Sequence, residues 1–198
     1  MANVLYGHKN THKINLENII QHSISAKRGI KKSLLVVDMP KGTYSNVKSA
    51  IKNAKMIIKK TRCDAVKLEN NNKNFKIIEN LVKRKIAVMG HIGFTPQFKK
   101  KFKIEGNSKK EASRLLKEAK LIEKAGAFSV VLECLSPRSA KLITKNINIP
   151  TIGIGSSYYC DGQILVTDDM LGLSGFYPKF VKKYVNLNRI IAKAVKKY

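Results

Sequence analysis

The sequence predicts an α/β fold with a parallel sheet, and three observations support that prediction. Short apolar runs rich in β-branched residues alternate with segments whose apolar residues recur at helical spacing. Six such runs, separated by helical segments, are typical of parallel βα units. The 198 residues contain no stretch that resembles an interdomain linker, so we expect a single domain over residues 1–198.

The expected strands follow one another along the whole chain. They cover residues 33–38, 65–69, 86–91, 128–133, 149–154 and 163–166, and Val4-Leu5-Tyr6-Gly7 resembles the end of another. Helical spacing predicts helices over residues 16–24, 47–58, 75–83, 108–126 and 136–145. The fourth helix has the clearest ends, because Ser108 and Glu111 form a Ser-x-x-Glu capping box and Gly126 suits a helix C-terminus.

Two architectures share this alternation of strands and helices. An open doubly wound sheet and a closed (β/α)8 barrel both agree with it, and periodicity alone leaves the choice open. A (β/α)8 barrel typically needs about 250 residues, and this chain has 198.

The chain is strongly basic, with 39 Lys and Arg residues against 13 Asp and Glu residues and a net charge of +26. Such a charge ordinarily favours a nucleic-acid or anionic-membrane partner. Here the charge is mostly Lys, spread along the chain together with abundant Asn and Ile, which A/T-rich codons explain without any binding function. We interpret the densest run, Lys99-Lys100-Lys101 between Phe98 and Phe102, as a solvated loop, and nucleic-acid binding as the minor alternative.

Composition excludes several classes of protein. No apolar run approaches the roughly 18 residues of a membrane helix, and the N-terminus lacks the features of a secretory signal. The three cysteines, Cys63, Cys134 and Cys160, are odd in number and show no CxxC spacing, so we expect neither a disulfide framework nor a zinc site. A soluble cytoplasmic protein is therefore expected.

Ionisable residues stand at the ends of four expected strands: Asp38, Glu69, His91 and Glu133. Only 13 carboxylates occur in the chain, and three of them lie at these positions. Because the carboxyl ends of parallel strands meet on one face, these side chains should converge where α/β folds place their active sites.

The residue types at these strand ends predict a chemistry. Asp38 and Glu69 are hard oxygen ligands that suit Mg²⁺. Lys67 points to the same side of its strand as Glu69, where it suits an anionic substrate or a simple ion pair with that carboxylate. Glu133, walled by apolar strands, suits a general base, and His91 suits hydrogen bonding to substrate or proton relay.

Seven ordered motifs resemble those of the ketopantoate hydroxymethyltransferase family, and the resemblance runs over essentially the whole chain. The motifs are Val37-Asp-Met-Pro40 with Gly42-Thr-Tyr44, Ala65-Val-Lys-Leu-Glu69, Val88-Met-Gly-His-Ile-Gly-Phe-Thr-Pro-Gln97, Val131-Leu-Glu-Cys134, Ile149-Pro-Thr-Ile-Gly-Ile-Gly155, Cys160-Asp-Gly-Gln-Ile-Leu-Val166 and Pro178-Lys-Phe-Val181. The third and the sixth are highly specific when they occur together.

The resemblance implies a (β/α)8 TIM-type barrel that transfers a hydroxymethyl group from 5,10-methylenetetrahydrofolate to 3-methyl-2-oxobutanoate, giving 2-dehydropantoate for pantothenate synthesis. It also implies Mg²⁺, a cytoplasmic location and a homo-oligomer of several subunits. Carried over by position, Asp38 is a metal ligand and substrate contact, Glu69 a second metal ligand, Lys67 a substrate contact and Glu133 the proton acceptor.

The resemblance also implies elements that this sequence does not contain. The family begins with a further strand, helix and strand that end in an Asp-Ser pair, and the alignment places that pair directly upstream of Met1. We therefore expect a barrel truncated at the N-terminus, with about six to seven of the eight strands, that also lacks the extreme C-terminus. Two alternatives remain open: a catalytically impaired or non-catalytic fragment of the family, and another Mg²⁺-dependent 2-oxo-acid barrel enzyme.

Overall fold

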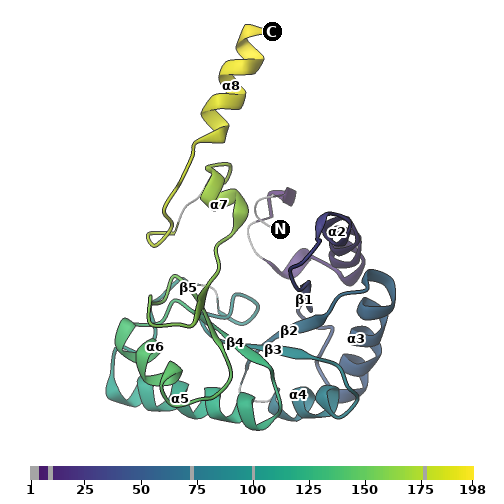
Figure 1. Ribbon diagram of the computed structural model, residues 1–198, viewed down its shortest axis with the longest axis vertical. Helices are drawn as coiled ribbons and strands as arrows, with labels where there is room; N and C mark the ends of the chain where they lie inside the picture. The colour runs from purple at the N-terminus through teal and green to yellow at the C-terminus, as the bar shows by residue number, and fades with distance from the viewer. Residues whose placement is uncertain (1–4, 9–10, 72–73, 100, 176–177) are drawn as a thin grey trace.

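Six parallel strands form one curved sheet in the order β1-β2-β3-β4-β5-β6, which is also their order along the chain (Figure 1). The computed structural model describes residues 5–8, 11–71, 74–99, 101–175 and 178–198. The strands are β1 (Val36–Asp38), β2 (Ala65–Glu69), β3 (Val88–Gly93), β4 (Ser129–Glu133), β5 (Thr151–Ile154) and β6 (Gly162–Gln163).

Helices connect the strands and cover the outer face of the sheet (Figure 1). They are η1 (Thr11–Lys13), α2 (Leu16–Gly29), α3 (Val47–Thr61), α4 (Phe75–Val82), α5 (Lys109–Lys124), α6 (Pro137–Thr144), α7 (Thr167–Leu171) and α8 (Leu187–Lys197). Helices α3 to α6 each join one strand to the next strand of the sheet, so the chain repeats the βα unit that the sequence predicts.

The hydrophobic core lies between the sheet and these helices. Alternate residues of the central strands point outward into it, and Leu68, Val88 and Leu132 are at most 1% exposed. Gly90 on β3 permits close approach of α5, because a Cβ at that position would lie 2.6 Å from Ile122 Cγ2. The packed helices hold the strands in place from the outer face of the sheet, and the inner face is therefore available to form a site.

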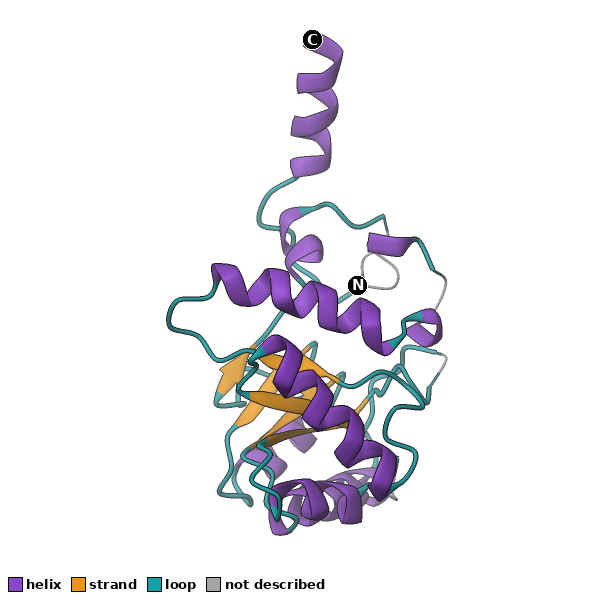
Figure 2. Cartoon of the chain, turned by 90° about the vertical axis from the view of Figure 1, so that its right-hand side faces the viewer, coloured by secondary structure: helices purple, strands orange, loops and turns teal. Residues whose placement is uncertain are grey.

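The sheet curls as the wall of a barrel that remains open (Figures 1 and 2). The residues of the inner face, including Val36, Met89, Val131 and Ile152, line one cavity. Within the described residues, β6 pairs only with β5 and β1 only with β2, so β1 and β6 are the two free edges. The fold is thus an incomplete (β/α) barrel, as the resemblance predicts, and this resolves the choice that periodicity left open.

The structure corrects several predicted element boundaries. The first strand begins at Val36 rather than at residue 33, and the last is limited to Gly162–Gln163. The stretch read as the end of a strand is helical at Leu5 and Tyr6, whereas Val4 lies outside the described residues. The described chain therefore contains six strands, the lower of the two numbers expected.

The predicted capping box at the start of α5 forms with different partners. Ser108 accepts a hydrogen bond from the Glu111 backbone N–H, as predicted. The Glu111 carboxylate accepts from the backbone N–H groups of Gly106 and Asn107, each at 3.2 Å. It therefore stabilises the loop before the helix as well as the first turn.

Helix α8 was not predicted from the sequence, and none of its residues is buried. It projects away from the barrel at the C-terminal end of the chain (Figures 1 and 2). No helix in the described parts of the chain is long and apolar enough to cross a membrane.

Candidate functional site

Asp38, Glu69 and Glu133 end their strands as predicted, and they converge with His91 at one end of the sheet. His91 lies two residues before the end of β3 rather than at its end, because β3 continues to Gly93. Strand register aligns Asp38 with Lys67 and Glu69 with His91, and Glu133 lies one strand further along. All five side chains line the inner cavity, which has a volume of about 830 Å³. The predicted convergence is confirmed, and its cause is the in-register pairing of parallel strands.

Lys67 forms an ion pair with Asp38, whose Oδ1 lies 2.5 Å from the ammonium Nζ. The sequence suggested Glu69 as the ion-pair partner, but Asp38 occupies the aligned position on the neighbouring strand. Burial opposes the lysine charge, yet the neighbouring carboxylates, Asp38 first among them, raise the pKa of Lys67. The Asp38 side chain remains 53% exposed toward the cavity, so this ion pair is accessible to a ligand.

Glu69 is almost fully buried at the end of β2. Burial is the main reason that the pKa of its carboxyl group rises from 4.5 to about 8; the charge of Lys67 opposes this rise, and the charges of Asp38 and Glu133 add to it. The backbone N–H of Gln97 donates a hydrogen bond to Glu69 Oε2 at 2.9 Å, and the Asn74 side chain donates to the Glu69 backbone carbonyl. The carboxyl group is therefore held in a fixed position but lacks a direct cationic partner in the described chain.

Glu133 and His91 lie side by side on β4 and β3. Burial raises the pKa of Glu133 to about 7, so this carboxylate is a stronger proton acceptor than an exposed glutamate. His91 is 2% exposed, and burial followed by the charge of Lys67 lowers its pKa, so the imidazole is neutral. Glu133 and His91 lie close to Lys67. One wall of the cavity therefore carries a base, a neutral imidazole and a cation.

The two nitrogens of His91 have different surroundings. Nδ1 lies 3.5 Å from Lys67 Nζ, which can only donate, so the proton of the neutral ring is assigned to Nε2. Nε2 lies 3.1 Å from Glu133 Oε2, but the geometry makes no hydrogen bond, and this buried nitrogen has no hydrogen-bond partner among the described residues. A buried N–H without a partner is costly, and a substrate oxygen entering the cavity would satisfy it.

The donor set at this site suits Mg²⁺ better than a softer metal. Asp38 and Glu69 present carboxylate oxygens to the same cavity, and Mg²⁺ commonly binds through one or two carboxylates while water and substrate complete its coordination. The described residues contain no cluster of three or more His, Cys, Asp or Glu side chains that could hold a metal ion, as a closed zinc site would require. A divalent cation would also offset the repulsion that raises the pKa of Glu69.

Sequence reasoning missed three polar residues that organise this site: Tyr44, Asn74 and Gln97. Each is buried, and each forms a hydrogen bond with a strand end or with another member of the set. Gln97 closes the third motif and Tyr44 closes the first, so the sequence signal for these two residues was the resemblance; Asn74 lies in none of the motifs.

The basic run near Phe98 does not have the features of a nucleic-acid site. Lys99 points inward, where it donates to the Gly93 carbonyl and pairs with Glu105. Phe102 stacks on Phe94 with ring centroids 4.2 Å apart, so one of its faces is already covered by another ring. Lys100 lies outside the described residues. The run is therefore partly structural, which weakens the base-stacking alternative.

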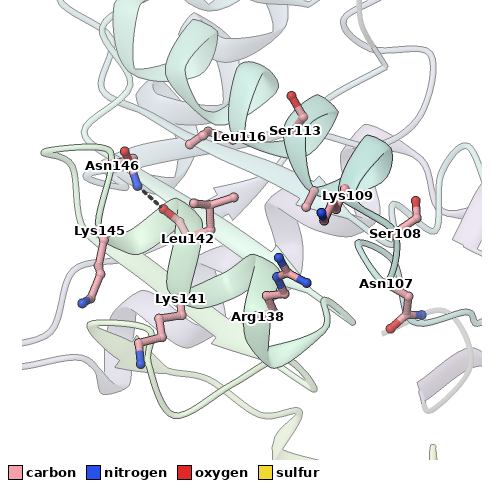
Figure 3. Close-up of a pocket in the computed structure, with 11 residues that line it drawn as sticks. Asn107, Ser108, Lys109, Ser113, Leu116, Arg138, Lys141, Leu142, Lys145 and Asn146 are labelled. Carbon is pink, nitrogen blue, oxygen red and sulfur yellow. Dashed lines mark hydrogen bonds between the residues drawn. The ribbon is translucent and has the colours of Figure 1, made fainter.

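A second cavity of about 470 Å³ lies on the outer surface between α5 and α6 (Figure 3). Its described lining carries four cationic side chains and no carboxylate, histidine or cysteine. The cationic side chains are those of Lys109, Arg138, Lys141 and Lys145. This surface lacks the acid, base and nucleophile groups that the inner cavity contains, so the inner cavity is the candidate active site.

The fold and this site together define an enzyme-type (β/α) barrel, with carboxylates, a lysine and a histidine gathered toward the carboxyl ends of its strands. Comparison with known proteins identifies the family. The model of the ketopantoate hydroxymethyltransferase family matches residues 1–198, and the chain belongs to that family of transferase enzymes.

Relatives of high identity agree with the family assignment. The 3-methyl-2-oxobutanoate hydroxymethyltransferase of Pelagibacter ubique (strain HTCC1062) is 50% identical over 198 residues, which is all of this chain and 77% of the relative. The protein of the same name from Clostridioides difficile (strain 630) is 46% identical and aligns with 98% of this chain and 73% of its own length.

Solved structures of low identity share the fold. A 2,3-dimethylmalate lyase of the PEP mutase/isocitrate lyase superfamily superimposes with a TM-score of 0.63 at 12% identity, covering 98% of this chain and 69% of that one. The phosphoenolpyruvate phosphomutase of Streptomyces platensis subsp. rosaceus gives a TM-score of 0.60 at 12% identity, covering 97% and 69%. These likenesses support the barrel architecture alone.

Proposed function

We propose that the inner cavity catalyses transfer of a hydroxymethyl group from 5,10-methylenetetrahydrofolate to 3-methyl-2-oxobutanoate, with Mg²⁺ held by Asp38 and Glu69. The single observation that carries this proposal is the position of Glu133. Its buried carboxylate, with a pKa raised to about 7, faces the same cavity as the Asp38–Lys67 ion pair. A carbon acid next to a carbonyl needs such a base beside groups that stabilise negative charge.

In this reaction Glu133 removes the proton from C3 of the oxo acid. Lys67, an ammonium group 2.5 Å from Asp38, binds the negatively charged oxo acid and turns toward it from Asp38. The Nε2–H of His91, which has no hydrogen-bond partner in the described chain, donates to a substrate oxygen beside Glu133. When bound, Mg²⁺ supplies positive charge that stabilises the charge developing on the keto oxygen. Hydrolysis of 5,10-methylenetetrahydrofolate by water breaks the bonds from the methylene carbon to N5 and N10 and gives tetrahydrofolate and formaldehyde. The enolate carbon C3 then attacks formaldehyde, and the alkoxide that forms takes up the proton that Glu133 removed.

The first half of this reaction can be tested without folate. The protein is incubated with 3-methyl-2-oxobutanoate and Mg²⁺ in D₂O, and deuterium incorporation at C3 is followed by proton NMR. We expect exchange in the wild type, strong loss in Glu133→Gln, and partial retention in Glu133→Asp, which keeps the carboxylate but shortens it by one methylene. Exchange that is equal in the wild type and in Glu133→Gln would contradict the role of Glu133.

The second half distinguishes this function from that of other Mg²⁺-dependent 2-oxo-acid barrels. Formation of 2-dehydropantoate should require both the oxo acid and 5,10-methylenetetrahydrofolate. Product formation that does not depend on tetrahydrofolate would overturn the proposed one-carbon donor while leaving the enolisation step intact.

We also propose that the protein acts in the cytoplasm as a homo-oligomer of several subunits whose chains each form one barrel domain. Light scattering on the purified chain, at several concentrations, measures the subunit number. A monomer at all concentrations would contradict the oligomeric proposal.

A further inference from the structure

We infer that Gln97 and Tyr44 form a positioning clamp that aligns the two carboxylates proposed to bind the metal. Gln97 is 7% exposed and lies in a turn after β3, where the Thr95 carbonyl accepts from the backbone N–H groups of Phe98 and Lys99. Neither clamp residue is proposed to contact substrate or metal. Their action is indirect, through the strand ends that they join.

Three hydrogen bonds of Gln97 reach three different segments. Its backbone N–H donates to Glu69 Oε2 at 2.9 Å, which fixes the carboxyl group at the end of β2. Its Nε2 donates to the carbonyl of Met39 at 2.9 Å, which fixes the residue directly after Asp38 on β1. Its Oε1 accepts from the Tyr44 hydroxyl at 2.6 Å, in the loop between β1 and α3. Gln97 thus joins the end of β2 through its backbone and the segment after β1 through its side chain.

The chemistry of this network requires an amide at position 97. The Met39 carbonyl can only accept a hydrogen bond, so the NH₂ group of Gln97 must face it and the amide oxygen must face Tyr44. Tyr44 must then be the donor, and burial raises the pKa of its hydroxyl so that it stays protonated. A glutamate or methionine at position 97 cannot complete both contacts.

The loop that carries Tyr44 is itself anchored. The Asn53 side chain on α3 donates to the Thr43 carbonyl at 2.7 Å, and the Thr43 hydroxyl donates to the Pro40 carbonyl. Tyr44 is 3% exposed and is therefore held by packing as well as by its hydrogen bond. Through the clamp, the anchored loop holds the ends of β1 and β2 in place. Residues that do not touch a metal ion commonly influence its binding in this way, by orienting the residues that do.

Tyr44→Phe and Gln97→Met test the clamp, because each removes hydrogen bonds while nearly preserving side-chain volume. The matched control is Thr61→Val, which removes a buried hydroxyl bonded to the Ile57 carbonyl at the opposite end of the sheet. This inference rests on the proposed function for one of its two readouts, Mg²⁺ affinity measured by calorimetry in the presence of the oxo acid. We expect both clamp variants to bind Mg²⁺ about tenfold more weakly and the control to match the wild type.

The second readout does not depend on metal or activity. Amide hydrogen exchange of the Gln97 N–H reports directly on its bond to Glu69. We expect exchange to be roughly tenfold faster in Tyr44→Phe but unchanged in Thr61→Val, under conditions where global unfolding is negligible. The double variant Tyr44→Phe/Gln97→Met should bind Mg²⁺ no more weakly than Gln97→Met alone, because the Tyr44 bond ends on Gln97.

The outcomes separate the clamp from the proposed function. Wild-type exchange rates in Tyr44→Phe, or Mg²⁺ losses that add in the double variant, would overturn the clamp. A wild-type protein that binds no Mg²⁺ would overturn the proposed metal site, and the exchange experiment would still decide whether the clamp exists.

Discussion

The centre of the sheet and its edges place similar sequence features in different environments. In the centre, Glu69 on β2 and Glu133 on β4 are carboxylates shielded by neighbouring strands, and burial raises both pKa values. At the edge, Asp38 on β1 ends its strand in the same way but remains 53% exposed beside Lys67. The number of strands that flank a strand-end carboxylate thus decides whether it is buried with a raised pKa or exposed beside a cation.

The helices show the same contrast. Helices α5 and α8 both carry apolar residues at helical spacing, but Leu115 of α5 is fully buried against the sheet and Ile191 of α8 is 51% exposed. The difference arises because α5 lies over the central strands β3 and β4, whereas α8 projects away from the barrel (Figure 1). Amphipathic spacing therefore predicts a helix but not the surface that it packs against.

The largest expected effect concerns the central base. Glu133→Gln should lower turnover by about 10²–10⁴-fold, the usual contribution of a general base, while binding of the oxo acid stays nearly unchanged. Steady-state kinetics and calorimetric titration with the oxo acid measure the two quantities. Full turnover at neutral pH in this variant would exclude Glu133 as the base.

The next effect compares the packed helix with the projecting one. Leu115→Ala should lower the free energy of unfolding by about 2–5 kcal/mol, because it leaves a cavity in the core. Ile191→Ala should change it by less than about 0.5 kcal/mol. Urea denaturation followed by circular dichroism measures both. Equal losses in the two variants would mean that α8 is packed in solution against another surface.

The pH dependence of stability sharpens the comparison of carboxylates. Folding raises the pKa of Glu69 from 4.5 to about 8, so the stability linked to this proton is fully present below pH 4.5 and is lost as the pH rises through 8. The pKa of Glu133 is raised to about 7, so loss of its proton also lowers the free energy of unfolding as the pH rises. Without Mg²⁺, the free energy of unfolding should therefore fall by on the order of 2–3 kcal/mol between about pH 5.5 and 8.5.

The control for this pH dependence is Glu69→Gln, which has no titrating carboxyl group at that position. Its stability should decline less over the same interval, and the remaining slope should come from Glu133. Denaturation curves at matched ionic strength measure this. A wild-type stability that rises over the interval would contradict the assignment of raised pKa values to the buried carboxylates.

The smallest effect ranks the two proposed metal ligands. Asp38→Asn should weaken Mg²⁺ binding by roughly tenfold more than Glu69→Gln, because the exposed Asp38 is proposed to contact both metal and substrate. Glu69, with a pKa of about 8, carries a proton at neutral pH that metal binding must displace. Calorimetric Mg²⁺ titrations with the oxo acid present provide the ranking, and the reverse order would show that the central carboxylate dominates.

Much of the fold and the site could be predicted from the sequence. The strand at residues 65–69 has the predicted bounds, Ser108 caps α5 as predicted, and the strand-end ionisable residues meet in one cavity. These predictions succeeded because apolar periodicity and capping are local, and because parallel strands place their carboxyl ends together.

Other features depend on contacts between distant residues. Lys67 pairs with Asp38 on the neighbouring strand rather than with Glu69 two residues away, because Asp38 and Lys67 share a register position. The length of β6 and the exposure of α8 likewise depend on the segments that each of them contacts, and composition alone does not determine them.

The sequence by itself determined the βα repeat, the family and the set of ionisable residues at the strand ends, since each depends on residue type and spacing along the chain. Only the tertiary structure decided which of these residues are buried, which are paired and which share a hydrogen bond. Burial raises the proton affinity of Glu69 and Glu133, and the Gln97 network spans residues 39 to 97. Such properties arise from desolvation and cross-strand distance, and both exist only after the chain has folded.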